Sequence, residues 1–217
     1  MSTPSEEPVW KQRAVERSIQ SAKARAGQRV QRFLDAAQAI ISEKNSTEFT
    51  VQEVVDRSRQ SLRSFYLHFD GKHELLLALF EDALGHAADQ IRAAATGHDK
   101  PVDALRTAIQ LLFELCRPDP QAQRPLFTDF APALLVSHPT EVKVAHAPLL
   151  DLFTELFTEA EQSGQLRKGV RPHRMAALVM QTVMFNAQSS DASDEPARPL
   201  TAEEIWEFCA NGFTRHK

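Results

Sequence analysis

The stretch TVQEVVDRSRQSLRSFYLHFDGKHELL, residues 50–76, decides how the chain folds, because it predicts two short helices and the start of a third. Thr50 and Glu53 have the Thr-x-x-Glu spacing of a capping box, in which each side chain accepts a hydrogen bond from the other residue's backbone amide. A short helix is therefore expected to begin at Thr50. Ser61 is a second candidate N-cap and opens the segment SLRSFYLHF, where Phe65 and Phe69 share one helix face.

Longer helices are expected on both sides of this stretch. Before it, apolar residues recur with the spacing of one buried helix face, ending near EKNST: Val30, Phe33, Leu34, Ala37, Ile40 and Ile41. After the helix-breaking DGK, an amphipathic helix begins around His73 with an apolar stripe of Leu75, Leu76, Leu79, Phe80, Ala83 and Leu84. Two short helices joined by a tight turn and braced by a longer one predict a helix-turn-helix domain over residues 28–73.

The rest of the chain, residues 74–217, reads as a second helical unit. Hydrophobic residues make up 42% of the 217, enough for a real core, while only seven glycines interrupt sequences rich in Ala, Leu, Gln and Glu. We therefore predict an all-α fold. Beyond the helix that begins near His73, this unit is expected to hold helices over 101–116, 121–136, 140–163, 172–190 and 201–215.

Several classes of protein are disfavoured by composition. The sequence has no apolar run near eighteen residues and no secretory leader pattern, so we expect a cytoplasmic protein without a membrane span. The two cysteines, Cys116 and Cys209, lack metal-binding spacing and are expected to be buried thiols rather than a disulfide or zinc site.

Charge is divided unevenly along the chain, although the formal net charge is only -4. Residues 1–72 hold 12 Lys and Arg against 9 Asp and Glu, and the remainder holds 13 against 20. Residues 1–27 form a basic arm, expected to be flexible or conditionally helical. Two readings of this arm stay open: a solvated tail, or an arm that follows phosphates or enters the adjacent minor groove.

Residues 30–80 resemble the DNA-binding domain of the TetR family of bacterial transcriptional regulators. FTVQEVVDRS and SFYLHFDGKHELL carry the resemblance, and the later SGQLRKGVRPHRMAALVMQTVMF resembles the entry to the family's penultimate helix. The resemblance implies phosphate contacts from Thr50, Ser64, Tyr66, His68 and Lys72, and base-edge contacts from Leu62 and Arg63. Gln60 and Ser61 complete the predicted DNA-binding set.

Each of these residues also has a structural reading. Tyr66 and His68 taken alone would be a packed aromatic and a surface histidine, and Arg63 could be a solvated helix charge. As a base reader, Arg63 would favour guanine through paired hydrogen bonds to O6 and N7, while Leu62 could contact a thymine methyl group.

The sequence departs from the family at the turn, where Ser58-Arg59-Gln60 replaces a segment that resembles Ala-Gly-Val. The family's glycine relieves a positive φ, so we expect Arg59 to adopt a mildly strained conformation. Either the turn geometry differs slightly, or Arg59 and Gln60 contact DNA.

The C-terminal unit is rich in large apolar residues, which are typical of a helical core. The resemblance implies in addition an apolar effector cavity among the helices between 101 and 157, and a dimer contact formed by 172–190 and 201–215. The residues predicted to line the cavity are Phe113, Phe127, Phe130, Phe153, Phe157, Met180 and Met184.

The combination predicts a homodimeric DNA-binding transcriptional regulator, a repressor released from a palindromic operator by a small apolar effector. An all-helical enzyme is one alternative, but a di-iron bundle needs Glu-x-x-His pairs, and the chain offers only the Asp70-x-x-His73 spacing. A helical adaptor that binds only protein is another. No catalytic residue, metal or cofactor is expected.

Overall fold

The computed structural model describes residues 8–44, 46–117, 137–189 and 200–215. Within these ranges the regular elements are helices, accompanied by an isolated bridge between Leu166 and Thr214. In chain order they are α1 (Val9–Lys44), α2 (Val51–Ser58), α3 (Leu62–Tyr66), α4 (Lys72–Ala95), α5 (Pro101–Cys116), α7 (Pro139–Ala145), α8 (Ala147–Gln162), α9 (Pro172–Ser189) and α10 (Ala202–Phe213). The all-α prediction is confirmed, while the helix predicted over 121–136 lies outside the described residues.

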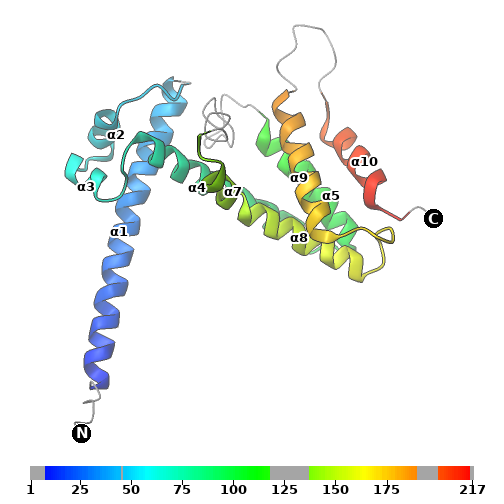
Figure 1. Cartoon of the computed structure of the whole chain (residues 1–217), viewed down its shortest axis with the longest axis horizontal. Coiled ribbons are helices and arrows are strands. Elements are labelled where there is room, and N and C mark those ends of the chain that lie inside the picture. The colour runs from blue at the N-terminus through cyan, green and yellow to red at the C-terminus, as the bar shows by residue number, and fades with distance from the viewer. Residues whose placement is uncertain (1–7, 45, 118–136, 190–199, 216–217) are drawn as a thin grey trace.

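The first helix starts much earlier than its apolar pattern predicts. α1 begins at Val9 and runs unbroken through Val30 to Lys44 (Figure 1). Residues 9–29 are almost all exposed, so no buried face marks them in the sequence, yet they contain many good helix formers and no proline. Of the two states expected for the basic arm, its described part has the helical one.

The helix predicted over 140–163 is divided into α7 and α8, which meet at His146. Pro148 accounts for the break, because it has no amide hydrogen to donate to the preceding turn. α8 resumes the helical pattern with the Leu150 amide, which donates to the carbonyl of His146 at 3.0 Å. The helices predicted at 172–190 and 201–215 correspond to α9 and α10.

Two separate clusters of buried side chains divide the molecule. One joins α1, α2, α3 and the first turns of α4, and we call this part the N-terminal domain. The other joins the rest of α4 to α5, α7, α8, α9 and α10, which we call the C-terminal domain. The change falls between Leu79 and Phe80, so α4 belongs to both domains and connects them (Figure 1). The domain boundary predicted after residue 73 stays a prediction.

Both cysteines are buried free thiols, as expected. Burial raises the pKa of Cys209 to about 11, and it raises the pKa of Cys116 even further. No helix in the described ranges has both the length and the apolar character that crossing a bilayer requires.

Candidate nucleic-acid interface

The two short helices begin as their capping residues predict. Thr50 Oγ1 accepts a hydrogen bond from the Glu53 amide at 3.2 Å, and the Glu53 carboxylate accepts one from the Thr50 amide at 2.7 Å. Ser61 Oγ accepts the Ser64 amide at 3.1 Å and so caps α3. Both N-caps have extended backbone, and the orphan amides of each first turn are partly satisfied.

The turn between α2 and α3 has the positive φ expected at Arg59, whose φ and ψ are 55° and 38°. The Arg59 amide donates to the carbonyl of Asp56 and the Gln60 amide to that of Val55, each at 3.2 Å. These bonds satisfy carbonyls at the end of α2, as a left-handed residue after a helix usually does. The turn therefore keeps a common C-cap geometry without its usual glycine.

Gln60 connects this turn to α1. Its side-chain amide donates to the carbonyl of Arg29 at 3.0 Å, across 31 positions of sequence. The side chain is half-buried, and its nitrogen is engaged within the protein. The expectation that Gln60 contacts DNA stays a prediction.

Three phenylalanine rings fix α3 against α1. Phe33 meets Phe65 edge-on at a centroid distance of 5.4 Å and Phe69 at 6.1 Å, while Phe65 and Phe69 lie 5.3 Å apart. All three rings are buried, which confirms the predicted core role of Phe65 and Phe69. Edge-to-face contacts of this kind add to the stabilisation from burial alone.

With those rings turned inward, the opposite side of α3 faces outward. Leu62 is 43% exposed and Tyr66 55% exposed, and Arg63 is also exposed. The remaining predicted DNA-binding residues lie around this face: Thr50 and Ser61 are exposed, whereas Ser64, His68 and Lys72 are half-buried. The predicted DNA-binding residues therefore lie on three consecutive elements: the start of α2, the outer side of α3 and the start of α4.

The contribution of two residues beside this surface, Phe49 and Leu67, was not predicted. Phe49 is buried just before the Thr50 N-cap, and the Lys72 ammonium lies 4.6 Å from its ring centroid, in a cation–π contact. An apolar residue before an N-cap is a known sequence signal, but it gives no hint of the contact with Lys72. Leu67, directly after α3, is 71% exposed beside Tyr66.

Not every basic side chain of the N-terminal domain is available to an anionic partner. Arg57 pairs with Glu43 at 2.5 Å and Lys44 pairs with Glu53 at 2.5 Å, joining α1 to α2. The hydrogen bond from Lys44, followed by those from Thr50, lowers the pKa of Glu53 to about 2. Both Lys44 and Arg57 are thus matched by carboxylates, and the candidate interface depends on other cations.

Most of the predicted effector residues are part of the core. Phe113, Phe153 and Phe157 are fully buried and Met180 and Met184 nearly so, all in the core of the C-terminal domain. Phe127 and Phe130 lie outside the described residues. That these side chains line a ligand cavity stays a prediction.

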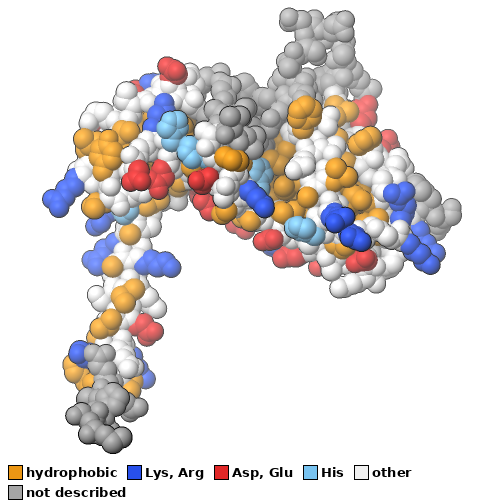
Figure 2. Space-filling view, in the orientation of Figure 1, with side chains coloured by type: hydrophobic (Ala, Val, Ile, Leu, Met, Phe, Trp, Pro, Cys, Tyr) orange, Lys and Arg blue, Asp and Glu red, His pale blue; other side chains and the backbone are white. Residues whose placement is uncertain are grey.

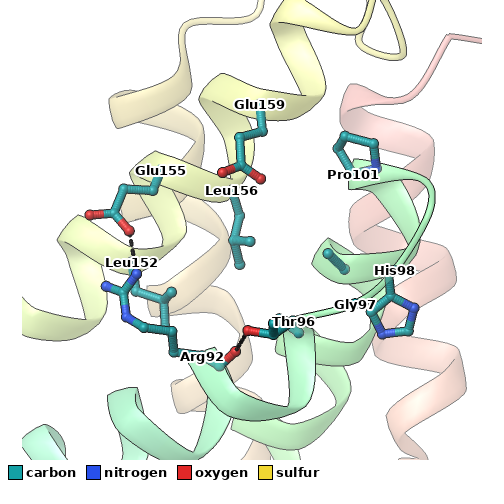
Figure 3. A pocket seen from close by; sticks show the side chains of 11 residues that line it. Arg92, Thr96, Gly97, His98, Pro101, Leu152, Glu155, Leu156 and Glu159 are labelled. Carbon is teal, nitrogen blue, oxygen red and sulfur yellow. Dashed lines mark hydrogen bonds and ion pairs between the residues drawn. The ribbon is translucent and has the colours of Figure 1, made fainter.

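A pocket of about 280 Å³ opens elsewhere, where the end of α4, the start of α5 and α8 meet (Figure 3). Arg92 and Glu155 form an ion pair of 2.6 Å at its edge, and Glu159 follows one turn later on α8. Leu152 and Leu156 add apolar surface. Its lining includes none of the predicted effector residues. Within the described ranges, no three His, Cys, Asp or Glu side chains are grouped closely enough to hold a metal ion.

Comparison with known proteins agrees with the assignment of the N-terminal domain. Residues 33–79 match the family model described as bacterial regulatory proteins, tetR family. The chain is also 32% identical over 69 residues to the uncharacterized HTH-type transcriptional regulator YvdT of Bacillus subtilis, a match that spans 32% of this chain and 36% of that relative. The predicted resemblance is confirmed for this part of the chain.

Solved structures share the fold over most of the chain. SmeT, the repressor of the Stenotrophomonas maltophilia multidrug efflux pump SmeDEF, aligns with a TM-score of 0.61 and 21% identity, over 86% of this chain and 90% of its own. The regulator FadR from Bacillus subtilis, in complex with stearoyl-CoA, aligns with a TM-score of 0.62 and 16% identity, over 84% and 98%. These likenesses support an N-terminal helix-turn-helix domain followed by a helical C-terminal domain.

Proposed function

We propose that this chain, which carries a tetR-type helix-turn-helix domain, is a DNA-binding transcriptional repressor whose operator binding responds to a small ligand. The observation that carries the proposal is the outer side of α3, where Leu62, Arg63 and Tyr66 are exposed and the Tyr66 ring packs edge-on against the buried Phe65. Such a helix can enter a major groove about 12 Å wide. Because the partner is chromosomal DNA, we expect the protein to act in the cytoplasm.

Within this interface, phosphate and base contacts have different consequences. Lys72 would neutralise a phosphate, so Lys72→Ala should lower the slope of log K against log salt by about 0.9 for each bound subunit. Tyr66→Phe removes only a hydroxyl group and should weaken binding without changing that slope. Arg63→Ala should cost about 1–3 kcal/mol at one base pair and relax the preference there.

Fluorescence anisotropy on an operator selected from genomic fragments tests these roles. Lys168→Ala, on an exposed loop between α8 and α9, is the matched control and should leave the slope unchanged. Wild-type affinity and slope in the Lys72→Ala and Tyr66→Phe variants would contradict the assigned docking surface. A wild-type chain that binds no selected fragment would instead favour an adaptor that binds only protein.

The dimer contact is proposed on α9 and α10. Leu178 on α9 is 59% exposed and Phe208 on α10 is 71% exposed, so both place large apolar surfaces in water in the isolated chain. Paired with a second copy, they would be covered, and the two DNA-binding surfaces would face half-sites whose centres lie about 34–36 Å apart or a multiple of that distance.

Sedimentation of charged variants tests this contact. The double variant Leu178→Glu, Phe208→Glu should sediment as a monomer, while Val144→Glu, at a residue 60% exposed on α7, should leave the assembly unchanged. A double variant that keeps the wild-type assembly would place the interface elsewhere.

The effector is proposed to be an apolar or amphiphilic molecule bound in the C-terminal domain. The support is the concentration of phenylalanine and methionine side chains there, and the solved complex of the structurally similar FadR with stearoyl-CoA. An effector releases DNA only if it binds the released state more tightly. Stearoyl-CoA should therefore weaken operator binding where coenzyme A alone does not. If coenzyme A alone weakened operator binding as much as stearoyl-CoA does, the acyl chain would have no role in effector binding.

A further inference from the structure

The first part of α1, residues Val9–Arg29, projects from the N-terminal domain as a helix with almost no packing partner (Figure 1). We call it the projecting helix. Its side chains are exposed except for the partly covered Ala26, and the buried cluster of the domain begins only at Phe33. Packing therefore does not explain why this segment carries the side chains it has.

The helical period places several apolar side chains of the projecting helix in one row, while basic side chains are spread around the rest of its surface. Val15, Ile19, Ala22 and Ala26 follow the spacing of one face, in line with the buried Phe33 further along. Arg13 and Arg17, four residues apart, lie on the opposite side together with the exposed Trp10, and Arg25 lies about a quarter turn from the apolar row; Figure 2 shows basic side chains along this part of the molecule. Among the residues that the structure describes, no ion pair joins these three arginines to a carboxylate.

The projecting helix leaves the domain beside the candidate interface. Arg29, its last residue, accepts the hydrogen bond from the Gln60 side chain. Gln60 directly precedes Ser61, the N-cap of α3, so the turn that presents α3 is also attached to the base of the projecting helix. DNA seated on α3 would have the cationic helix next to it.

The length and width of the projecting helix limit how it can contact duplex DNA. At about 1.5 Å per residue the segment is roughly 30 Å long, which matches about nine base pairs of duplex. A helix is about 10–12 Å across, too wide for a minor groove of about 6 Å. Minor-groove entry, one of the possibilities for the basic arm, therefore does not suit this helical form.

We infer that the projecting helix is a second DNA-contacting element, in which Arg13, Arg17 and Arg25 bind backbone phosphates of the duplex that flanks each half-site. The inference rests on the proposed DNA-binding function and extends it beyond the helix-turn-helix footprint. Duplex DNA is favoured over an anionic membrane surface because the face that would enter lipid has only Val15 and Ile19 as large apolar side chains, and Ala22 and Ala26 add little apolar area.

Binding by the full-length protein tests the inference on two duplexes centred on the selected operator. One covers only the two half-sites, about 20 base pairs, and the other adds about ten base pairs on each side. The triple variant Arg13→Gln, Arg17→Gln, Arg25→Gln is compared with wild type and with a matched control, Lys143→Gln, Lys168→Gln, Arg171→Gln, in the C-terminal domain.

Wild type and control should bind the longer duplex more tightly, and the triple variant should not show that advantage. Removing three phosphate-binding charges from each subunit lowers the salt slope by about 2.7, so between 50 and 200 mM salt the affinity of wild type should fall about 40-fold more per subunit than that of the variant. Equal slopes would overturn the inference. Arginine-dependent binding to anionic vesicles, with equal slopes on DNA, would do so in favour of a membrane surface.

A second variant separates the helix from the charge. Ala22→Pro keeps every arginine but breaks the helix between Arg17 and Arg25. It should reduce the advantage of the longer duplex, whereas an unchanged advantage would overturn the role of helical structure. A preference for the operator over random duplex that is preserved in all variants would show that the helix-turn-helix domain still functions. If the wild type itself had no such preference, the proposed function would fail.

Discussion

Arg59→Gly is predicted to stabilise the N-terminal domain, although it removes a charged side chain and adds a glycine. Arg59 is in the left-handed region, with φ 55° and ψ 38°, and its side chain is exposed. That conformation costs a non-glycine residue about 1–2 kcal/mol, while glycine adds about 0.5–1 kcal/mol of backbone entropy to the unfolded chain. The difference predicts a net gain of about 0.5–1 kcal/mol.

Native-state amide hydrogen exchange measures this gain locally, which matters because the two domains have separate buried clusters. The Phe65 amide, which donates to the Ser61 carbonyl at 3.0 Å, reports on α3. Its exchange should slow about 2- to 5-fold in the glycine variant. Arg59→Gln is the control, since it removes the charge but keeps a side chain in the left-handed region, and it should show no such slowing. Equal exchange in both variants would refute the strain argument.

Three further outcomes concern other side chains. The pKa of Glu53 is lowered to about 2, so the stabilisation from its ionised form is present above pH 4.5 and is lost as the pH falls towards 2. The thermal unfolding temperature should therefore depend less on pH across that range in Glu53→Gln than in wild type. Cys116 and Cys209 are buried with raised pKa values, so both should resist iodoacetamide at pH 8 until the protein unfolds, and rapid native labelling would contradict their burial. Phe33→Ala removes the ring that packs edge-on against both Phe65 and Phe69, and it should destabilise the N-terminal domain by about 3–5 kcal/mol, measured by exchange of its amides. A loss below about 1 kcal/mol would contradict the packing.

Local features of the fold could be predicted from sequence because their causes are local. The Thr50–Glu53 capping box, the Ser61 cap and the inward Phe65 and Phe69 each depend on residues within one turn of helix. The positive φ at Arg59 was also predictable, since a turn of this kind needs it whichever residue is present.

Contacts between distant residues could not be predicted. Nothing in the sequence relates Gln60 to the carbonyl of Arg29, or Lys72 to the ring of Phe49, because both contacts depend on how α1, α2 and α4 pack. The early start of α1 was missed for a different reason. Apolar periodicity is a strong helix signal only where one face is buried. The projecting helix buries no face, and its apolar row has only Val15 and Ile19 as large side chains.

The outer side of α3 is proposed to read a specific DNA sequence, and the ratio of two binding affinities measures that specificity. Genomic fragments selected by the full-length protein are compared with scrambled duplexes of the same length and composition, at one salt concentration. The selected fragments should share a palindrome and bind at least about 10³-fold more tightly than the scrambled DNA. Fragments without a common motif, bound no more tightly than scrambled duplex, would contradict that proposal.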